Sequence, residues 1–226
     1  MGSALQAVIS PKRIEDPLAY LPRKSITSYK KGQIIFTQGQ SATGLHLVVK
    51  GLVKVFIPKN GSCSLVLDIL PAEEFFGESG ILGCPEREDS AVALEKTDLM
   101  SWNTQEIEEQ MERQPRLGIA LIQKLTNRVV DLEHRLESSA LDLTPRRVAR
   151  CLLRFAERLG KEGSDGARHL PPLSHQLISE YAGTSREVVT FNMNRLRQQG
   201  YVQYSRRGIT VHLQALREEL MTMQQE

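Results

Sequence analysis

The chain has 226 residues, of which 40% are hydrophobic and 25% charged, a composition typical of globular proteins with a buried core. This composition excludes a disordered chain, a collagen-like repeat and a simple coiled coil. No apolar run reaches the roughly 18 residues that would span a bilayer, and three scattered cysteines fit a reducing compartment, so we expect a cytoplasmic protein. Residues 144–226 hold 13 Lys and Arg against 8 Asp and Glu, which indicates either a polyanionic partner or ordinary surface ion pairs.

The segment from Tyr29 to Trp102 has the pattern of short β-strands. Its apolar runs of about five residues stop at Gly39, at Gly51 and at Asn60-Gly61. Asn-Gly between two β-branched runs is a hairpin signal, because both residues tolerate positive φ. Strands this short and closely spaced predict a small antiparallel β-roll rather than alternating βαβ units.

Beyond Thr104 the apolar spacing becomes helical. Apolar residues recur every three or four positions for more than 20 residues after Pro115, which predicts one helix on the order of 30 Å long. Such a helix is longer than one small roll needs, so we expect a homodimer; packing on its own roll alone is the alternative. The predicted dimer seam consists of Leu117, Leu121, Leu125, Val129, Leu132 and Leu136.

Two short helices joined by a glycine turn follow in the basic third of the chain. Ser174 caps the first, Ala182-Gly183-Thr184 forms the turn, and the second begins near Ser185. This pattern predicts a helix-turn-helix whose second helix enters the major groove of DNA. We therefore divide the chain into an N-terminal segment with the roll (1–114), a dimerisation helix (115–140) and a DNA-binding domain (141–226).

The second helix carries the expected base-reading residues Arg186, Glu187 and Thr190. Arg can donate two hydrogen bonds to guanine, and Glu can accept one from cytosine N4. Glu187 also fits a capping box with Thr184, which is the purely structural alternative. For Phe191 two alternatives remain: a position in the core, or contact with a thymine methyl group or a sugar of the DNA.

A hairpin with Arg206 and Arg207 at its tip follows the second helix, as in the wing of a winged helix. Such residues contact phosphates, which fix the register of a protein on DNA without reading its sequence. The expected phosphate contacts are Ser174, Gln176, Ser185, Arg195, Arg206 and Arg207.

The chain resembles the Crp/Fnr family, winged-helix transcription regulators typified by the catabolite activator protein and the fumarate-nitrate regulator. Phe76-Gly77-Glu78, Ser90-Ala91, Leu141-Asp142-Leu143-Thr144 and Ser185-Arg186-Glu187-Val188-Val189 carry this resemblance. It implies an α+β fold, in which a cyclic-nucleotide-binding-like antiparallel β-roll precedes a long dimerisation helix and a winged helix-turn-helix. It also implies a bacterial homodimer that binds a near-palindromic operator in double-stranded DNA and contacts RNA polymerase.

The resemblance places an effector pocket in the roll. In members that bind cyclic AMP, an Arg directly before the Ser-Ala pair neutralises the phosphate, whereas Asp89 stands there in this chain and would repel it. Asp131 and Leu132 occupy the positions of the adenine-contacting Thr and Ser. We therefore expect an effector other than cyclic AMP, or none; a cyclic-nucleotide response through a phosphate site shifted to Arg87 is the alternative. Pocket candidates are Gly77, Glu78, Arg87, Ser90, Ala91 and Asp131.

Other functional classes lack their motifs. An iron–sulfur cluster needs four cysteine ligands, and neither His46 nor His134 has the context of a haem ligand, so the sequence carries no iron–sulfur or haem signature. We expect no metal site, and the sequence does not identify a cofactor. There is no nucleophile elbow, P-loop, dinucleotide fingerprint or H-E-x-x-H, so we expect no catalytic residues and no enzyme. A cyclic-nucleotide module of a kinase or channel would lack the winged helix.

Overall fold

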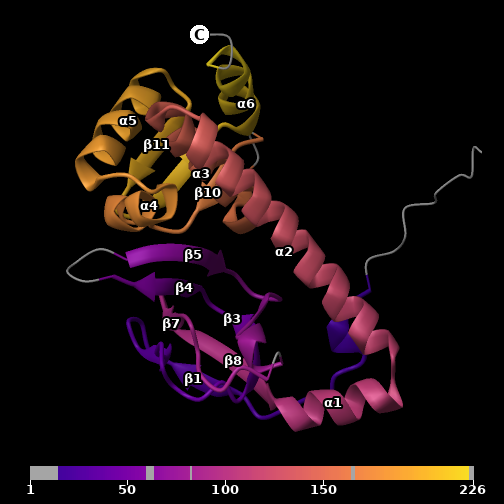
Figure 1. Ribbon diagram of the computed structural model, residues 1–226. Helices are drawn as coiled ribbons and strands as arrows, with labels where there is room; N and C mark the ends of the chain where they lie inside the picture. Colours follow the sequence, from indigo (N-terminus) through magenta and orange to yellow (C-terminus); the bar gives the residue numbers. More distant parts are fainter. Residues whose placement is uncertain (1–14, 60–63, 82, 164–165, 224–226) are drawn as a thin grey trace, which may run out of the picture.

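The computed structural model describes residues 15–59, 64–81, 83–163 and 166–223. A β-rich N-terminal half is joined by one long helix to a C-terminal domain that lies over the roll (Figure 1). This is the α+β architecture predicted from the sequence. Among the described residues, no helix is long and apolar enough to cross a membrane.

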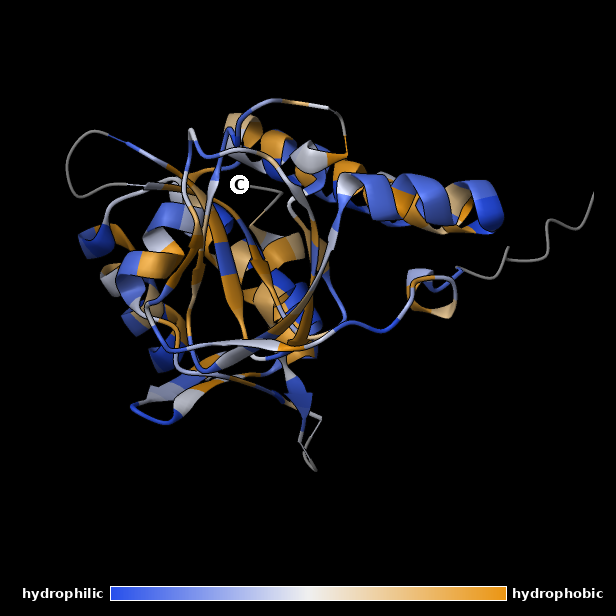
Figure 2. Cartoon of the chain, turned by 90° about the horizontal axis from the view of Figure 1, so that it is seen from below, coloured by the Kyte–Doolittle hydropathy of each residue, from blue (hydrophilic) through white to orange (hydrophobic). Residues whose placement is uncertain are grey.

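Two four-stranded antiparallel sheets form the roll, with strand orders β1-β8-β3-β6 and β2-β7-β4-β5. Strands of the roll are largely hydrophobic (Figure 2), and Val48, Val55 and Phe76 belong to one buried cluster. Gly39 and Gly51 have positive φ at the turns that the sequence marked, whereas the predicted Asn60-Gly61 turn lies outside the described residues. The elements are η1 (Pro17–Ala19), β1 (Thr27–Tyr29), β2 (Ile34–Phe36), β3 (Gly44–Lys50), β4 (Val53–Pro58), β5 (Ser64–Leu70), β6 (Phe75–Phe76), η2 (Glu78–Gly80), β7 (Ser90–Ala93) and β8 (Thr97–Asn103).

Two helices follow the roll: α1 (Thr104–Arg113) and the 26-residue α2 (Arg116–Leu141). Asn103 caps α1 and forms a capping box with Glu106. The side chain of each residue accepts a hydrogen bond from the backbone N–H of the other. At 1.5 Å per residue α2 is about 39 Å long and runs from the roll to the C-terminal domain (Figure 1).

The apolar residues of α2 divide between two surfaces. Leu117 and Leu121 are buried in the protomer's own core with Leu45, Trp102 and Ile107, so their predicted place in a dimer seam is wrong. Further along the helix, the apolar side chains are exposed and recur at alternating intervals of three and four. The side chains with this spacing are Ile122, Leu125, Val129, Leu132 and Leu136, and Val130 and Leu141 are exposed as well.

The C-terminal domain has the predicted winged-helix arrangement. Helix α4 ends at Gly183, whose φ of 65° makes the tight turn before α5, and Ser174 and Ser185 cap the two helices. A small sheet of order β11-β12-β10-β9 completes the domain. The elements are α3 (Thr144–Leu159), β9 (Lys161–Glu162), β10 (Arg168–Leu170), α4 (His175–Ala182), α5 (Arg186–Gln198), β11 (Val202–Ser205), β12 (Gly208–Val211) and α6 (Leu213–Thr222).

The C-terminal domain is docked on the roll through apolar and ionic contacts. Val66 and Ile69 of β5 belong to the same buried cluster as Leu177 and Tyr181 of α4. Beside this cluster, Arg135 of α2 donates a 2.8 Å hydrogen bond to the Val66 carbonyl oxygen. The helix α2 therefore contacts both domains where they meet.

A ladder of four arginines spaced four residues apart on α3 fixes the docked orientation. Its partners are Asp131 on α2, Asp142 at the C-terminal cap of α2, and Asp68 on β5. Arg158 makes two hydrogen bonds to Asp68, of 2.6 and 3.2 Å, in the bidentate geometry that favours Arg-carboxylate pairs. The remaining pairs are Arg146–Asp142, Arg150–Asp142 and Arg154–Asp131 at 3.2, 3.1 and 2.5 Å.

Candidate nucleic-acid interface and effector pocket

The helix α5 presents its first turn to solvent. Arg186 and Glu187 are exposed, while Val189, Met193 and Leu196 fill the inner face against the domain core. The N-cap of α5 is Ser185, whose side chain accepts a hydrogen bond from the Val188 backbone N–H. Thr184 is therefore not the N-cap that the predicted capping box with Glu187 requires. Hydrogen bonds from its own backbone N–H and the Ser185 hydroxyl lower the pKa of Glu187, so it is present as a carboxylate able to accept a hydrogen bond.

Thr190 lies on the same helix but is half-buried and already bonded. Its hydroxyl donates to the Arg186 carbonyl oxygen at 2.9 Å and lies 2.8 Å from Nδ1 of His175, the first residue of α4. Sequence reasoning missed His175, although its place directly after the cap Ser174 brings it beside α5. Burial, and then the charge of Arg186, lower its pKa, so His175 is neutral at neutral pH.

A second polar link joins α5 to the wing. The Tyr204 hydroxyl on β11 donates to Asn194 Oδ1 at 2.8 Å, and the Tyr204 ring meets the edge of His175 at 5.5 Å. These contacts hold α4, α5 and strand β11 together as one unit, and a binding site needs such rigid support.

The predicted phosphate contacts fall into three groups. Arg206 and Arg207 are exposed at the tip of the β11–β12 hairpin, where they are free to meet a phosphate backbone. Two others have partners within the domain: Gln176 donates to Glu180 at 3.0 Å, and Arg195 lies 3.9 Å from Glu219. The caps Ser174 and Ser185 are exposed at helix N-termini, which attract anions.

Arg87 occupies the interior of the roll. It is 2% exposed, donates to the carbonyl oxygens of Gly77 and Gly44 at 2.6 and 2.8 Å, and stacks 4.4 Å from the Phe36 ring centroid. Gly77 has a φ of 82°, which glycine adopts readily, and this turn aims its carbonyl oxygen at the guanidinium. A phosphate at its terminal nitrogens would displace these protein acceptors, whereas the buried Nε of Arg87 has no hydrogen-bond partner among the described residues.

Two other pocket candidates, Ser90 and Ala91, begin strand β7. Ser90 is buried and accepts a hydrogen bond from the Gln38 backbone at 2.9 Å, and Ala91 is fully buried. Asp89 is half-buried, and its Oδ1 has no hydrogen-bond partner among the described residues. Burial, and then the charge of Glu78, raise the pKa of Asp89, as expected for a carboxyl short of compensating donors.

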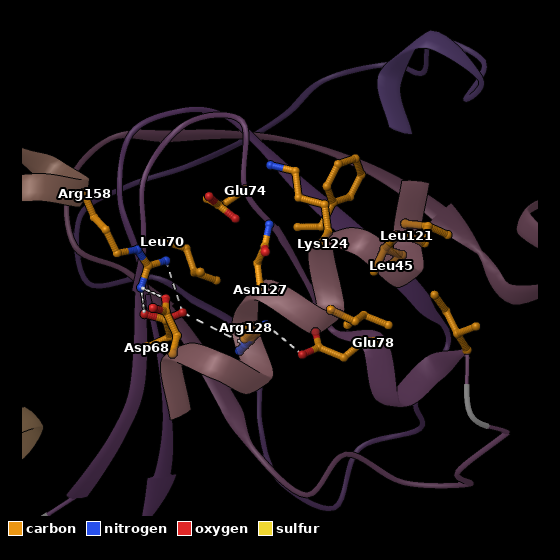
Figure 3. A pocket seen from close by; sticks show the side chains of 14 residues that line it. Leu45, Asp68, Leu70, Glu74, Glu78, Leu121, Lys124, Asn127, Arg128 and Arg158 are labelled. Carbon is orange, nitrogen blue, oxygen red and sulfur yellow. Dashed lines mark hydrogen bonds and ion pairs between the residues drawn. The ribbon is translucent and has the colours of Figure 1, made fainter. Parts of the chain in front are cut away.

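A cavity of about 130 Å³ lies between the roll, α2 and the end of α3 (Figure 3). Four carboxylates and three basic side chains line it, and the two shortest ion pairs among them are Glu78–Arg128 at 2.7 Å and Asp68–Arg158 at 2.6 Å. Of the predicted pocket residues, only Glu78 and Asp131 line this cavity. The charged lining residues are Asp68, Glu74, Glu78, Asp131, Lys124, Arg128 and Arg158.

Comparison with known proteins agrees with both halves of the structure. The cyclic nucleotide-binding domain family model matches residues 26–114, and the Crp-like helix-turn-helix domain model matches residues 146–219. The cyclic AMP receptor protein of Thermus thermophilus is 30% identical over 219 residues, 97% of each chain. The global nitrogen regulator of Synechocystis sp. is 26% identical, covering 83% of this chain and 84% of its own.

Solved structures give the same result. FixK2 from Bradyrhizobium japonicum superposes with a TM-score of 0.75 at 22% identity, covering 86% of this chain and 96% of its own. A CRP/FNR-family regulator from Thermus thermophilus has a TM-score of 0.72 at 25% identity, covering 87% and 98%. With a roll, a long helix and a winged helix in this order, the chain belongs to the Crp/Fnr family of transcription regulators.

Proposed function

We propose that this transcription regulator acts in the cytoplasm as a homodimer that places two α5 helices in successive major grooves of a pseudo-palindromic operator. The observation that carries this proposal is the exposed first turn of α5, where Arg186 and Glu187 lie beside a wing tipped by Arg206 and Arg207. In such dimers the half-sites lie about 34–36 Å apart. RNA polymerase is the protein partner that family resemblance supports.

The exposed apolar stripe of α2 supports the homodimer. Ile122, Leu125, Val129, Leu132 and Leu136 follow the alternating 3–4 spacing of a coiled-coil seam, in which each side chain packs into the facing helix. Leu136 is 71% exposed in the single protomer, which is costly unless a second copy covers it. We assign residues 115–140 to this dimerisation helix, residues 1–114 to the sensor part and 141–226 to the DNA-binding part.

The effector, if there is one, is proposed to be a molecule other than cyclic AMP. Asp89 takes the place of the phosphate-binding Arg, Asp131 is paired with Arg154, and the Arg87 guanidinium is bonded to Gly77 and Gly44. The alternative is a shifted phosphate site at Arg87, where phosphate would bind Nε, which has no partner among the described residues, or replace the carbonyl oxygens at the terminal nitrogens. The Thermus thermophilus relative described as a cyclic AMP receptor makes this alternative worth testing.

Two solution measurements test the proposal. Sedimentation equilibrium at micromolar concentration is expected to give a dimer alone and two protomers per operator duplex; a monomer in both cases would contradict the dimer. Calorimetric titration with cyclic AMP is expected to show no binding at micromolar concentration. Micromolar binding that is lost in Arg87→Ala, but kept in the exposed-residue control Arg113→Ala, would establish the alternative.

A further inference from the structure

Phe191 stands out on the reading face of α5. Its side chain is 70% exposed, and among the described residues it is the sole aromatic in the set of large exposed hydrophobic side chains. The inner face of the helix is already filled by Val189, Met193 and Leu196, so the core position considered from the sequence is not where Phe191 lies. An exposed phenyl ring contributes little to folding, and its place on this face indicates a binding role.

The neighbours of Phe191 on the helix are less free to contact a base. The Thr190 hydroxyl is held between the Arg186 carbonyl oxygen and His175, and the Asn194 amide oxygen accepts the Tyr204 hydroxyl. Phe191 lies one turn after Glu187, so these two side chains are neighbours on one exposed stripe. Arg186, Glu187 and Phe191 are therefore the side chains best placed to enter the groove.

The chemistry of a phenyl ring restricts what it can read. It neither donates nor accepts conventional hydrogen bonds, and the apolar group that base pairs display in the major groove is the C5-methyl group of thymine. One helical turn is about 5.4 Å and one base step about 3.4 Å, so Phe191 reaches one or two base pairs from the one met by Glu187.

We propose that Phe191 is a specificity-determining residue that contacts a thymine methyl group in each half-site, and that it reads a base in place of Thr190, which the sequence had assigned to base reading. This inference depends on the proposed function, since it requires α5 to lie in the major groove. Thr190 then acts as a positioning residue, which links α4 to α5 through His175.

Deoxyuridine substitution tests the contact directly, because uracil lacks only the methyl group. An operator is first selected from random DNA, and each thymine is then replaced by deoxyuridine symmetrically in both half-sites. For the wild-type protein, one replacement is expected to weaken binding about fourfold per half-site, or roughly 15-fold for the dimer, as for loss of one buried methyl group. Phe191→Ala is expected to bind the thymine and uracil operators equally.

Two further variants complete the test. Phe191→Leu keeps an apolar contact and is expected to retain part of the methyl preference, whereas Gln198→Ala, at the exposed end of α5, is expected to retain all of it. If Phe191→Ala keeps the full methyl preference, or if no thymine responds to replacement, the inference is wrong while the proposed function stands. If Phe191→Ala weakens all sequences alike, the ring contacts a sugar and the inference is also wrong. If no operator is selected at all, both are overturned.

Discussion

The protonation of His46 provides a quantitative test of how the roll is packed. Its imidazole ring stacks on Phe36 with ring centroids 5.8 Å apart and is tilted against Phe76 at 5.1 Å, and its Nε2 lies 3.4 Å from Nη2 of Arg87. A guanidinium can only donate hydrogen bonds, so Nε2 accepts and Nδ1 carries the proton that faces the Ser101 hydroxyl at 2.7 Å. Protonating Nε2 would bring a second positive charge against Arg87 inside the roll.

Burial, and then the charge of Arg87, lower the pKa of His46 from 6.5 to about 4. Because the folded pKa lies below the unfolded one, the stabilisation is complete above pH 6.5 and is lost as the pH falls toward 4. One pH unit in this window is worth about 1.4 kcal/mol. Between pH 7.5 and pH 5 we therefore expect His46 to reduce the free energy of unfolding of the roll by about 2 kcal/mol.

Urea unfolding followed by tryptophan fluorescence measures this loss of unfolding free energy in the roll. Trp102 is the sole tryptophan of the chain and is 2% exposed, on β8 of the roll. His46→Gln is expected to show a pH dependence smaller by about 2 kcal/mol between pH 7.5 and 5 than the wild type does. His134→Gln, which removes an exposed histidine of α2, is the matched control and is expected to follow the wild type.

The difference in unfolding free energy between wild type and His46→Gln isolates the contribution of the His46 imidazole. Asp89 acts in the opposite direction, since its raised pKa makes the roll more stable as it is protonated, and its contribution cancels in the difference. If wild type and His46→Gln lost stability in parallel between pH 7.5 and 5, the placement of His46 against Arg87 would be wrong.

Three further outcomes follow from the described contacts. In binding assays Arg186→Ala is expected to relax the preference at one base position, at a cost of about 1–3 kcal/mol in binding free energy. Arg207→Ala should weaken binding to all sequences alike and reduce the slope of log affinity against log salt concentration by about 0.9. The reverse pattern would contradict these roles. Asp68→Ala leaves Arg158 without its bidentate partner and is expected to destabilise the docked domains by about 2–3 kcal/mol in calorimetry; an unchanged thermogram would show that the ladder does not hold them. Leu136→Lys is expected to give a monomer at micromolar concentration by light scattering, and a persistent dimer would place the interface elsewhere.

Local signals account for the elements that sequence reasoning predicted well. The helix-turn-helix was predicted within about one residue, because Ser174, Gly183 and Ser185 mark helix ends through their own side chains or backbone freedom. Strand β8, from Thr97 to Asn103, was not predicted as a strand. It pairs with both β1 and β3, and no tight turn joins it to either strand.

Periodicity identified the apolar stripe of α2 but not what covers it. Leu121 and Ile122 are equally apolar neighbours, yet the first packs in the core with Leu45 and Trp102 and the second is exposed. The difference depends on where α2 crosses the roll, which is a tertiary property. The dimer seam predicted from the sequence therefore included Leu121 and omitted Ile122.

Long-range charge pairing was equally hidden in the sequence. Arginines at every fourth position from Arg146 to Arg158 are visible as a stripe, but their partners come from elsewhere in the chain: Asp68 on β5, and Asp131 and Asp142 on α2 and its C-terminal cap. The basic bias of the C-terminal domain therefore has two sources. Arg186 and Arg207 are open to DNA, while the arginine ladder binds the domain to the rest of the protomer.

Selection of DNA from a random pool by the purified protein, without added ligand and at a stated salt concentration, tests the central claim most directly. The account predicts an inverted repeat whose half-site centres lie one helical turn apart, with one half-site position that loses its preference in Arg186→Ala. Salt-sensitive binding with no enriched sequence, by the wild type and Arg186→Ala alike, would contradict it.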